Sequence, residues 1–504
     1  MNESSVPPVV SIHHLRSFAD REVTLQGWLH GRRSGGKIAF LLVRDGTGLC
    51  QCVVDAALPE AFALASELGQ ESSLVLTGKV RIDERSPGGC EIAITSLMVL
   101  QAVEGYPVTR KPHGIDFLLQ HRHLWLRAQR QTSILRIRHT IIKAARGYFD
   151  DAGFTLIDTP ILAPGAAEGA GTLFKVDYFG DEVYLAQTGQ LYLESAAMAL
   201  GKVYCFGPTF RAEKSKTRRH LAEFWMIEPE IAFADLDTLL HHAEGLTCRI
   251  IDDVLKAHDA DLAVLERNKD ALLRIKPPFH RMTYTDAVDL LHSEKTQAWI
   301  DEKLAKDQAS LEGMRAEMVS LEQQLAAAKK GWQQEKLDHQ IKELRESLRE
   351  LELDLTHRRD RREGARAFEW GNDLGGDEET VIAQQFDKPL FITNYPRGIK
   401  AFYMKPDPAK PDTVLNVDML APEGYGEVIG GSVREDRLDA LEARLREEGM
   451  KPDPYQWYLD LRRYGTVPHG GFGLGIERTI AWICGLRHIR ETIPFPRFAG
   501  RMYP

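Results

Sequence analysis

The stretch FGPTFRAEKSKTRRHLAEFWMIEPE, residues 206–230, is the most informative part of this chain for its fold and its chemistry. It reads as a strand, a loop and a second strand. The loop between Glu213 and His220 holds five basic residues when His220 is counted. Two antiparallel strands with cationic side chains at their inner ends suit a polyphosphate. A basic surface hairpin is the alternative interpretation.

A second informative stretch, PHGGFGLGIER, spans residues 468–478. Its glycines allow a backbone to approach a ligand closely. An apolar helix follows and would place Arg478 in its first turn. No Gly-Lys-Ser/Thr sequence follows, so this is not a phosphate loop of the Walker type. A packing turn explains an isolated glycine-rich segment equally well.

A third stretch, NVDMLAPEGYGEVIGGSVR, spans residues 416–434 and carries paired carboxylates. Asp418 and Glu427 lie on neighbouring strand-like segments joined by a Gly/Pro turn. Two hard oxygen ligands that leave other positions to water and phosphate are what Mg²⁺ favours. The pair is therefore a candidate magnesium site, with a solvated pair of acids at a strand end as the alternative.

Residues 1–103 are predicted to form a small domain of their own. Short β segments near 23–29, 38–43, 49–54 and 73–78 are separated by turn signals, and a helix is predicted near 57–68. This pattern favours a small closed barrel of the OB-fold type. Residues 104–128 read as a linker or hinge.

The second domain, residues 129–504, begins with an amphipathic helix over about 129–151. Strands and helices then alternate without a βαβ repeat, which favours an antiparallel sheet flanked by helices and an overall α+β fold. We also expect a strand over 399–403.

An inserted segment, residues 298–363, has no proline and carries two heptad runs of apolar residues broken at Lys329-Lys330-Gly331. It is predicted to be an antiparallel coiled-coil hairpin with arms of roughly 45 Å. Two interpretations stay open: a solvated decoration, or an arm that contacts tRNA or another partner. The second is favoured by the basic tip (Lys329, Lys330) or by Arg358, Arg359, Arg361 and Arg362 near the base.

Bulk properties bound the class of protein. A chain of 504 residues with 43% hydrophobic residues and a net charge of −9 fits a multidomain globular protein without a generally basic surface. A local basic face for RNA is still compatible with that charge. No apolar run is long enough to span a bilayer, and the N-terminus lacks a secretory pattern. The six cysteines are scattered. We therefore expect a cytoplasmic protein with no membrane association.

The three stretches, in this order, resemble the class II aminoacyl-tRNA synthetases, in particular the subgroup for aspartate, asparagine and lysine with its N-terminal OB-fold anticodon domain. The helix from Gln129 followed by Thr155–Pro160 looks like the dimer-forming motif of this family. The resemblance implies ATP, Mg²⁺, an amino acid and tRNA as ligands, and a homodimer formed through residues 129–160.

The resemblance also implies residue roles at the nucleotide. Arg211 would hold the α-phosphate, and Arg478 the γ-phosphate and one face of adenine. Phe224 would stack on the other face. Asp418 and Glu427 would carry Mg²⁺. Further nucleotide contacts would come from Glu213, Arg219 and His220. No side chain acts as a nucleophile, because the substrate carboxylate itself attacks the α-phosphorus.

The residues expected around the side chain of the amino-acid substrate indicate which amino acid is bound. Aspartate enzymes of the family carry a lysine at the position of Leu193, and an aspartate side chain without that partner would be unpaired. Glu228 could accept from the amide NH₂, and Arg434 could donate to the amide oxygen. These residues predict L-asparagine as substrate and tRNA-Asn as acceptor. Glu168 and Gln190 would meet the α-amino group.

Two alternatives accompany this prediction. One is an aspartyl-tRNA synthetase, discriminating or non-discriminating, which the apolar Leu193 disfavours. The other is a noncatalytic RNA-binding paralogue. This alternative is disfavoured because the chain retains Arg211, Arg478, Asp418 and Glu427. A lysine substrate is disfavoured because Arg434 would repel it.

The anticodon end is assigned by the same resemblance. Phe40 is the candidate for base stacking, and Arg33 and Gln51 are candidates for hydrogen bonds to bases or phosphates. The run 38–43 is apolar on both faces, so periodicity does not decide whether Phe40 belongs to the barrel core instead.

Overall fold

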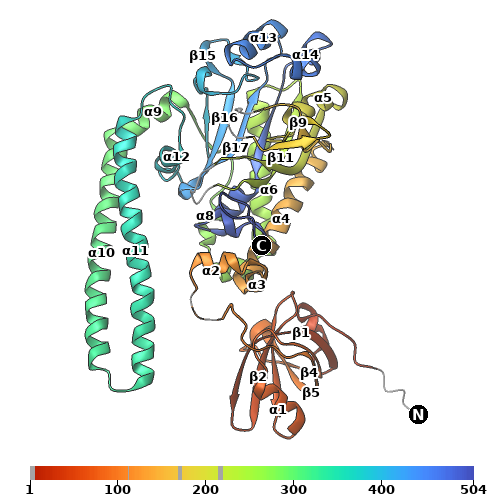
Figure 1. The fold of residues 1–504 in the computed structure, drawn as a ribbon, viewed down its shortest axis with the longest axis vertical. Coiled ribbons are helices and arrows are strands. Elements are labelled where there is room, and N and C mark those ends of the chain that lie inside the picture. The colour runs from red at the N-terminus through yellow and green to blue at the C-terminus, as the bar shows by residue number, and fades with distance from the viewer. Residues whose placement is uncertain (1–5, 110, 112, 168–172, 214–219) are drawn as a thin grey trace. The chain divides into compact units, whose positions relative to one another are not determined.

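The computed structural model describes residues 6–109, 111, 113–167, 173–213 and 220–504. The chain divides into two compact units, Met1–Ala128 with Tyr503–Pro504, and Gln129–Met502 (Figure 1). Among the described residues, no helix combines the length and the hydropathy needed to cross a bilayer.

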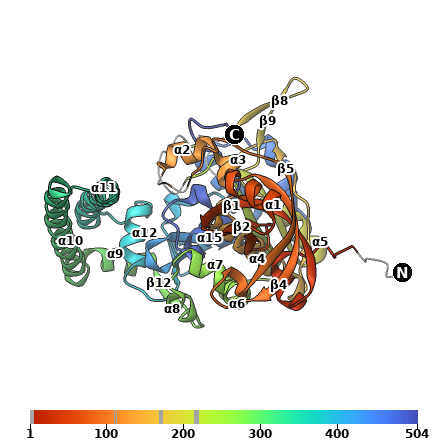
Figure 2. The same cartoon turned by 90° about the horizontal axis from the view of Figure 1, so that it is seen from below.

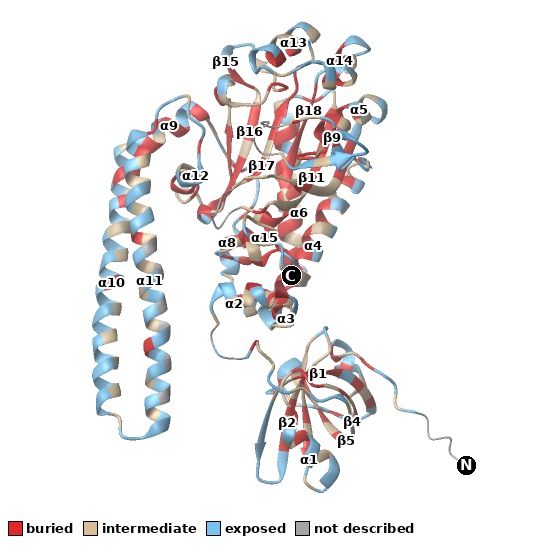
Figure 3. Ribbon diagram, in the orientation of Figure 1, coloured by how far each residue is buried: buried red, intermediate tan, exposed pale blue. Residues whose placement is uncertain are grey.

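The first unit is a closed barrel in the strand order β1-β2-β3-β5-β4. The short helix α1 (Pro59–Glu67) falls where a helix was predicted. Side chains alternate between the inside and the outside along each strand, and the inward ones form one apolar core (Figure 3). The strands are β1 (Glu22–Gly35), β2 (Ile38–Arg44), β3 (Leu49–Asp55), β4 (Ser73–Ile82) and β5 (Cys90–Gln101).

Residues 104–128, predicted as a linker, contain two short helices, α2 (Ile115–Gln120) and α3 (Arg122–Trp125). Trp125 is buried, and the guanidinium carbon of Arg122 lies 4.7 Å from the centre of its ring. This packing gives the segment ordered structure that its Pro- and Gly-containing start did not indicate.

The second unit is built on an eight-stranded sheet in the order β12-β13-β16-β17-β18-β11-β10-β6. Its six inner strands are antiparallel, and the two outermost pairs are parallel. The strands are β6 (Thr155–Leu156), β10 (Lys202–Phe210), β11 (Glu223–Ala232), β12 (His280–Thr283), β13 (Leu390–Thr393), β16 (Asn416–Ala421), β17 (Gly426–Val433) and β18 (His469–Gly475). The predicted α+β architecture is confirmed.

Three helices cover one face of this sheet: α4 (Gln129–Asp151), α6 (Leu236–Ala257) and α15 (Ile476–Cys484). Their apolar sides bury a common core with the sheet, including Ile141 of α4 and Ile227 of β11. The other face of the sheet is left for the site described below. Smaller elements complete the unit: α5 (Gln190–Leu200), α7 (Asp259–Val264), α8 (Lys269–Leu273), α9 (Tyr284–His292), α12 (Gly376–Ala383), α13 (Leu438–Glu447), α14 (Gln456–Arg463), and strands β7 (Leu162–Ala163), β8 (Lys175–Tyr178), β9 (Asp181–Leu185), β14 (Pro406–Asp407) and β15 (Lys410–Val414).

The segment predicted to be an insertion contains a pair of long antiparallel helices, α10 (Glu294–Ala327) and α11 (Gly331–Ala367), which lie side by side in Figures 1 and 2. Salt bridges tie the arms together, with Arg358 2.9 Å from Asp307 and Arg315 2.7 Å from Glu352. The base of the hairpin shares an apolar core with α9 and α12 through Ile300. The helices extend a few residues beyond the predicted bounds at both ends.

One local prediction is wrong. Residues 399–403 do not form a strand. The chain makes a short 3-10 turn at Arg397–Ile399, and Phe402 and Tyr403 are buried against α13 and α14. An apolar run that is buried by packing rather than by strand pairing produces the same sequence pattern.

Candidate active site

A cavity of about 660 Å³ lies over the face of the sheet that the helices leave uncovered. Strand β11 shows how it is built. Phe224, Met226, Glu228 and Glu230 line the cavity, whereas Ile227 and Ile231 point to the helical core. Alternation along a strand sends successive side chains to opposite faces, so one strand supplies both the core and the site.

Four of the six predicted nucleotide residues line this cavity. Arg211, His220, Phe224 and Arg478 all line it. The guanidinium carbon of Arg211 lies 5.6 Å from the centre of the Phe224 ring. Glu213 Oε2 is 3.3 Å from His220 Nε2. The cluster offers two guanidinium groups, which can bind phosphates, and an aromatic face, which can stack on a base. These groups suit a triphosphate joined to an aromatic base.

Asp418 and Glu427 lie on the adjacent strands β16 and β17 and both line the cavity. A Cβ atom added to Gly430 would stand 2.6 Å from Glu427 Oε1 and 3.6 Å from Asp418 Oδ1, so both carboxylates border the same point on β17. Arg478 Nη1 donates to Glu427 Oε2 at 3.1 Å and to the Glu427 carbonyl at 2.9 Å. Paired carboxylate oxygens open to a cavity fit Mg²⁺, a cation that prefers oxygen ligands and retains water.

Lys400 was not singled out by the sequence, yet its ammonium reaches this acidic pair. Its Nζ lies 2.8 Å from Asp418 Oδ2 and 4.0 Å from the centre of the Tyr395 ring. Asp373 also lines the cavity, and Glu379 of α12 accepts the Glu427 backbone N–H at 3.0 Å.

The electrostatics of the acidic pair follow from this setting. Burial raises the pKa of Asp418 to about 6; Lys400 opposes the shift and the charge of Glu427 adds to it. Burial also tends to raise the pKa of Glu427. The positive charges of Arg478, Lys400 and Arg211 outweigh this effect and hold the Glu427 pKa below its usual value. The pKa of Lys400 is raised, because Asp418, Asp373 and Glu427 overcome the effect of its burial. Lys400 therefore remains an ammonium at neutral pH.

Glu228, predicted to accept from a substrate amide, is a buried carboxylate that lines the cavity. Thr188 Oγ1 donates to its Oε1, and the Gly189 N–H donates to its Oε2 at 2.9 Å. Cys205 Sγ is a third donor, 3.4 Å from Oε2. These contacts fix the orientation of the carboxylate.

Arg434, the predicted partner of the amide oxygen, also lines the cavity and is 3% exposed. Its Nε and Nη2 donate to Glu230 at 3.2 and 2.9 Å, and its Nη1 donates to Ser432 Oγ at 2.9 Å. The two hydrogen bonds to Glu230 thus fix the orientation of the Arg434 guanidinium group. Leu193 lines the same cavity and is fully buried, so it presents an apolar side chain there.

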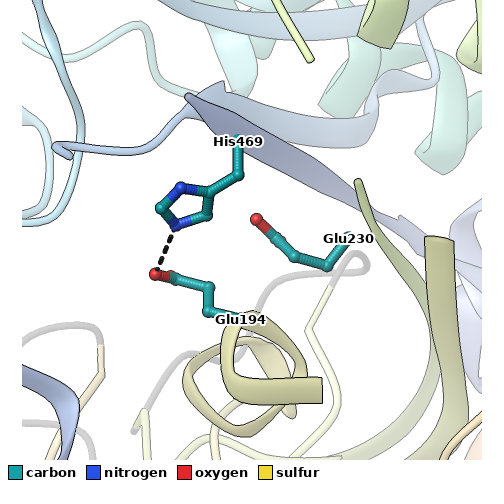
Figure 4. A group of neighbouring side chains, drawn as sticks. All are labelled: Glu194, Glu230 and His469. Carbon is teal, nitrogen blue, oxygen red and sulfur yellow. Dashed lines mark hydrogen bonds and ion pairs between the residues drawn. The ribbon is translucent and has the colours of Figure 1, made fainter. Parts of the chain in front are cut away.

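A buried network continues behind Arg434, and Figure 4 shows three of its members, Glu194, Glu230 and His469. Their ligand atoms approach one another as metal ligands do. However, Arg462 Nη2 donates to Glu194 at 2.7 Å, and Arg434 occupies both oxygens of Glu230. Two buried guanidinium groups neutralise the two carboxylates, so the arrangement is an ion-pair network rather than a cation site.

A separate candidate surface lies on the barrel. Phe40 is half-buried, whereas its neighbours Ala39 and Leu41 point into the core. The guanidinium carbon of Arg33 lies 4.7 Å from the centre of the Phe40 ring, and Arg33 Nη2 donates to Gln51 Oε1 at 3.1 Å. The structure thus brings the three predicted anticodon residues together and places Phe40 outside the barrel core.

Comparisons with known proteins place the chain in a family. The profile of the class II tRNA synthetases for D, K and N matches residues 114–499. The chain belongs to the class II tRNA synthetases. The profile of the OB-fold nucleic acid binding domain matches residues 23–100, which confirms the predicted type of barrel. As an aminoacyl-tRNA synthetase the chain is a ligase.

Full-length relatives of this class II synthetase agree with the assignment. The asparagine–tRNA ligase of Koribacter versatilis (strain Ellin345) is 46% identical over 502 residues, covering 99% of each chain. That of Desulforamulus reducens is 47% identical over 494 residues, covering 98% of this chain and 99% of the relative.

Solved structures are similar over almost the whole chain. The asparaginyl-tRNA synthetase of Pyrococcus horikoshii complexed with asparaginyl-adenylate has a TM-score of 0.80 and 40% identity, covering 97% of each chain. A putative aspartyl-tRNA synthetase from Leishmania major Friedlin has a TM-score of 0.75 at 20% identity, a likeness of fold alone.

Two predicted site residues of this class II synthetase, Glu168 and Arg219, lie outside the described residues. Gln190 lines the cavity, and its Nε2 donates to Glu194 at 3.1 Å. Glu230 is not among the predicted site residues, although its spacing of two from Glu228 places both on one face of β11. Lys400 is not among them either, because the sequence of the turn that presents this lysine resembles a strand.

Proposed function

We propose that this chain ligates L-asparagine to tRNA-Asn through an asparaginyl-adenylate, with AMP and diphosphate as products. The observation that carries the choice of amino acid is the set Glu228, Arg434 and Leu193 in the wall of one cavity. An ionised carboxylate accepts from the amide NH₂, and a guanidinium donates to the amide oxygen. The full-length asparagine–tRNA ligases among its relatives support the same substrate.

In the first step, an oxygen of the asparagine carboxylate attacks the α-phosphorus of ATP, and the bond to the leaving diphosphate breaks. Arg211 holds the α-phosphate, Arg478 holds the γ-phosphate, and Phe224 stacks on adenine. Glu213, Arg219 and His220 contribute further contacts to the nucleotide. Gln190 and Glu168 bind the α-amino group. The side chains supply position and charge rather than a nucleophile.

Asp418 and Glu427 would hold Mg²⁺ when ATP is bound. Their fit rests on two carboxylates that border one point of the cavity. A cation there would neutralise charge on the triphosphate. Lys400 keeps Asp418 ionised and oriented toward the cavity.

In the second step, the terminal hydroxyl of tRNA attacks the acyl carbon of the adenylate, and AMP leaves. The barrel binds the anticodon through Phe40, Arg33 and Gln51. An aromatic ring flanked by a guanidinium is suited to an unstacked base.

The chain forms a homodimer through residues 129–160. Leu156 in the edge strand β6 is 38% exposed, and Ile161 directly after the segment is 45% exposed. An apolar edge of this kind fits an isologous contact between two copies. Sedimentation of wild type and Leu156→Asp tests this: we expect a dimer and a shift toward monomer, and a monomeric wild type contradicts the proposal.

The function is tested by ATP–pyrophosphate exchange with asparagine or aspartate as the sole amino acid. We expect exchange with asparagine to exceed exchange with aspartate by about 10⁴-fold in kcat/KM, since polar sites of this kind discriminate that strongly. Aminoacylation of tRNA-Asn should follow. Preferential exchange with aspartate would identify an aspartyl-tRNA synthetase instead.

A further inference from the structure

Glu228 accepts hydrogen bonds from Thr188, Gly189 and Cys205. Thr188 and Gly189 lie directly before α5, and Cys205 lies on β10, in register opposite Glu228 on β11. Thr188, Cys205 and Glu228 are all at least nine-tenths buried. The carboxylate is therefore bordered on one side by these groups and on the other by the substrate cavity.

All three groups act as donors. The Gly189 backbone N–H can only donate. Thr188 Oγ1 accepts the Gln190 backbone N–H at 3.0 Å, and its own proton is directed to Glu228. Burial, together with the nearby Glu228 charge, raises the pKa of Cys205 well above its usual value, so its thiol keeps the proton that it donates. Three donors favour the ionised form of a buried carboxylate.

We propose that Thr188, assisted by Cys205, is a specificity-determining positioning residue that keeps Glu228 an acceptor only. This inference rests on the proposed function. An ionised Glu228 accepts the NH₂ of asparagine and repels the carboxylate of aspartate. Were Glu228 protonated, it could donate a hydrogen bond to aspartate, and the distinction between the two amino acids would weaken.

The threonine hydroxyl can be removed without changing the shape of the side chain. Thr188→Val deletes the donor and keeps the volume, whereas Thr188→Ser keeps the donor and removes a methyl group. A role in packing and a role in hydrogen bonding therefore predict opposite rankings of the two variants. Thr247→Val is the matched control, because Thr247 is equally buried but bonds to the Ala243 carbonyl within α6.

The experiment measures kcat/KM for asparagine and for aspartate by ATP–pyrophosphate exchange in wild type, Thr188→Val, Thr188→Ser and Thr247→Val. We expect the asparagine-to-aspartate ratio to fall about 10- to 100-fold in Thr188→Val, the loss associated with one hydrogen bond to a charged group. The change should appear in KM for the amino acid and leave KM for ATP unaltered. Thr188→Ser should restore most of the ratio, and Thr247→Val should keep it.

Several outcomes would overturn the inference. A folded Thr188→Val with a ratio within twofold of wild type removes the role of the hydroxyl, and an equal fall in Thr188→Ser assigns Thr188 to packing. If Thr188→Val does not fold, Cys205→Ala replaces it, with a smaller fall expected and an unchanged ratio contradicting the proposal. A wild type without preference for asparagine overturns the proposed function itself, whereas a selective wild type with an insensitive Thr188→Val overturns only this inference.

Discussion

Arg434 faces the cavity with three of its five N–H groups used by Glu230 and Ser432. Glu230 in turn is fully buried and close to Glu194, whose pKa is lowered because Arg462, His469 and Arg434 outweigh the effect of burial. Each charge at the amino-acid end is thus compensated before a substrate binds. Because the charged groups are already fixed by their partners, little free energy is spent on reorganising the site when the substrate amide binds.

Arg478 provides a test at the nucleotide. We expect Arg478→Ala to lower kcat/KM for ATP about 10²- to 10³-fold, as the loss of one preorganised group does, with KM for asparagine little changed. The measurement is ATP–pyrophosphate exchange at varied ATP. Arg463→Ala is the control, since Arg463 pairs with Asp460 in the solvent-exposed part of α14. Full activity of Arg478→Ala would remove this residue from the triphosphate site.

His242 gives a pH-dependent prediction. Burial, with Lys202 and His241 nearby, lowers its pKa to about 4. Between about pH 4 and pH 6.5 the unfolded chain therefore binds a proton at this position that the folded chain does not, so the stability of the fold rises with pH through this window. We expect the Tm of wild type relative to His242→Gln to decrease as the pH is lowered from 7 to 5. Parallel Tm curves for the two proteins would contradict the assignment.

At the scale of elements, the base of the hairpin formed by α10 and α11 is part of an apolar core of the second unit. Its base contributes Ile300, Ala365 and Phe368 to the core that α9, α12, β13 and β16 share. Three of the arginines that are candidates for RNA contact near the base are in ion pairs: Arg358 with Asp307, Arg361 with Asp377 and Arg362 with Asp301. The outer arms lie largely exposed (Figure 3). The stability of the catalytic unit should therefore depend on the base and not on the arms.

This difference can be measured. Replacing residues 312–354 by a short Gly-Ser turn should leave asparagine-dependent ATP–pyrophosphate exchange within about twofold of wild type. Ile300→Ala should destabilise the protein by about 2–4 kcal/mol in urea unfolding, because it opens a cavity in the shared core. Loss of exchange in the shortened protein would show that the arms support the active site. KM for tRNA of the shortened protein, measured at several salt concentrations, then distinguishes a tRNA-contacting arm from a decoration.

At the scale of the whole molecule, the two candidate sites lie on different apolar cores. The barrel core and the core under the sheet are separate sets of residues. The substitution of an outward-facing barrel residue should therefore act on RNA binding without altering the activation of the amino acid.

Phe40 tests this separation. We expect Phe40→Ala to raise KM for tRNA-Asn about tenfold or more, since stacking of one base on an aromatic ring contributes about 1–3 kcal/mol. Amino-acid-dependent ATP–pyrophosphate exchange should stay at the wild-type rate. Met98→Ala, which removes a 53% exposed side chain from β5 of the same barrel, is the control and should change neither value. An unaltered KM for tRNA in Phe40→Ala would remove this ring from the anticodon surface.

The sequence by itself was sufficient for the α+β class, the OB-fold type of the barrel, the helix from Gln129 and the two long helices of the hairpin, because periodicity and turn residues are local properties. It also indicated Arg211, Phe224, Asp418 and Glu427, which the structure places in one cavity.

Only the tertiary structure decided which groups fix one another. Glu230 holds Arg434, Thr188 and Cys205 hold Glu228, and Lys400 reaches Asp418 from a turn that looked like a strand. It also placed Phe40 outside the barrel core, although the residues on both sides of it along β2 are apolar. The physical reason is that hydrogen bonds and ion pairs between distant segments depend on strand register and packing, which a local pattern of residue types does not contain.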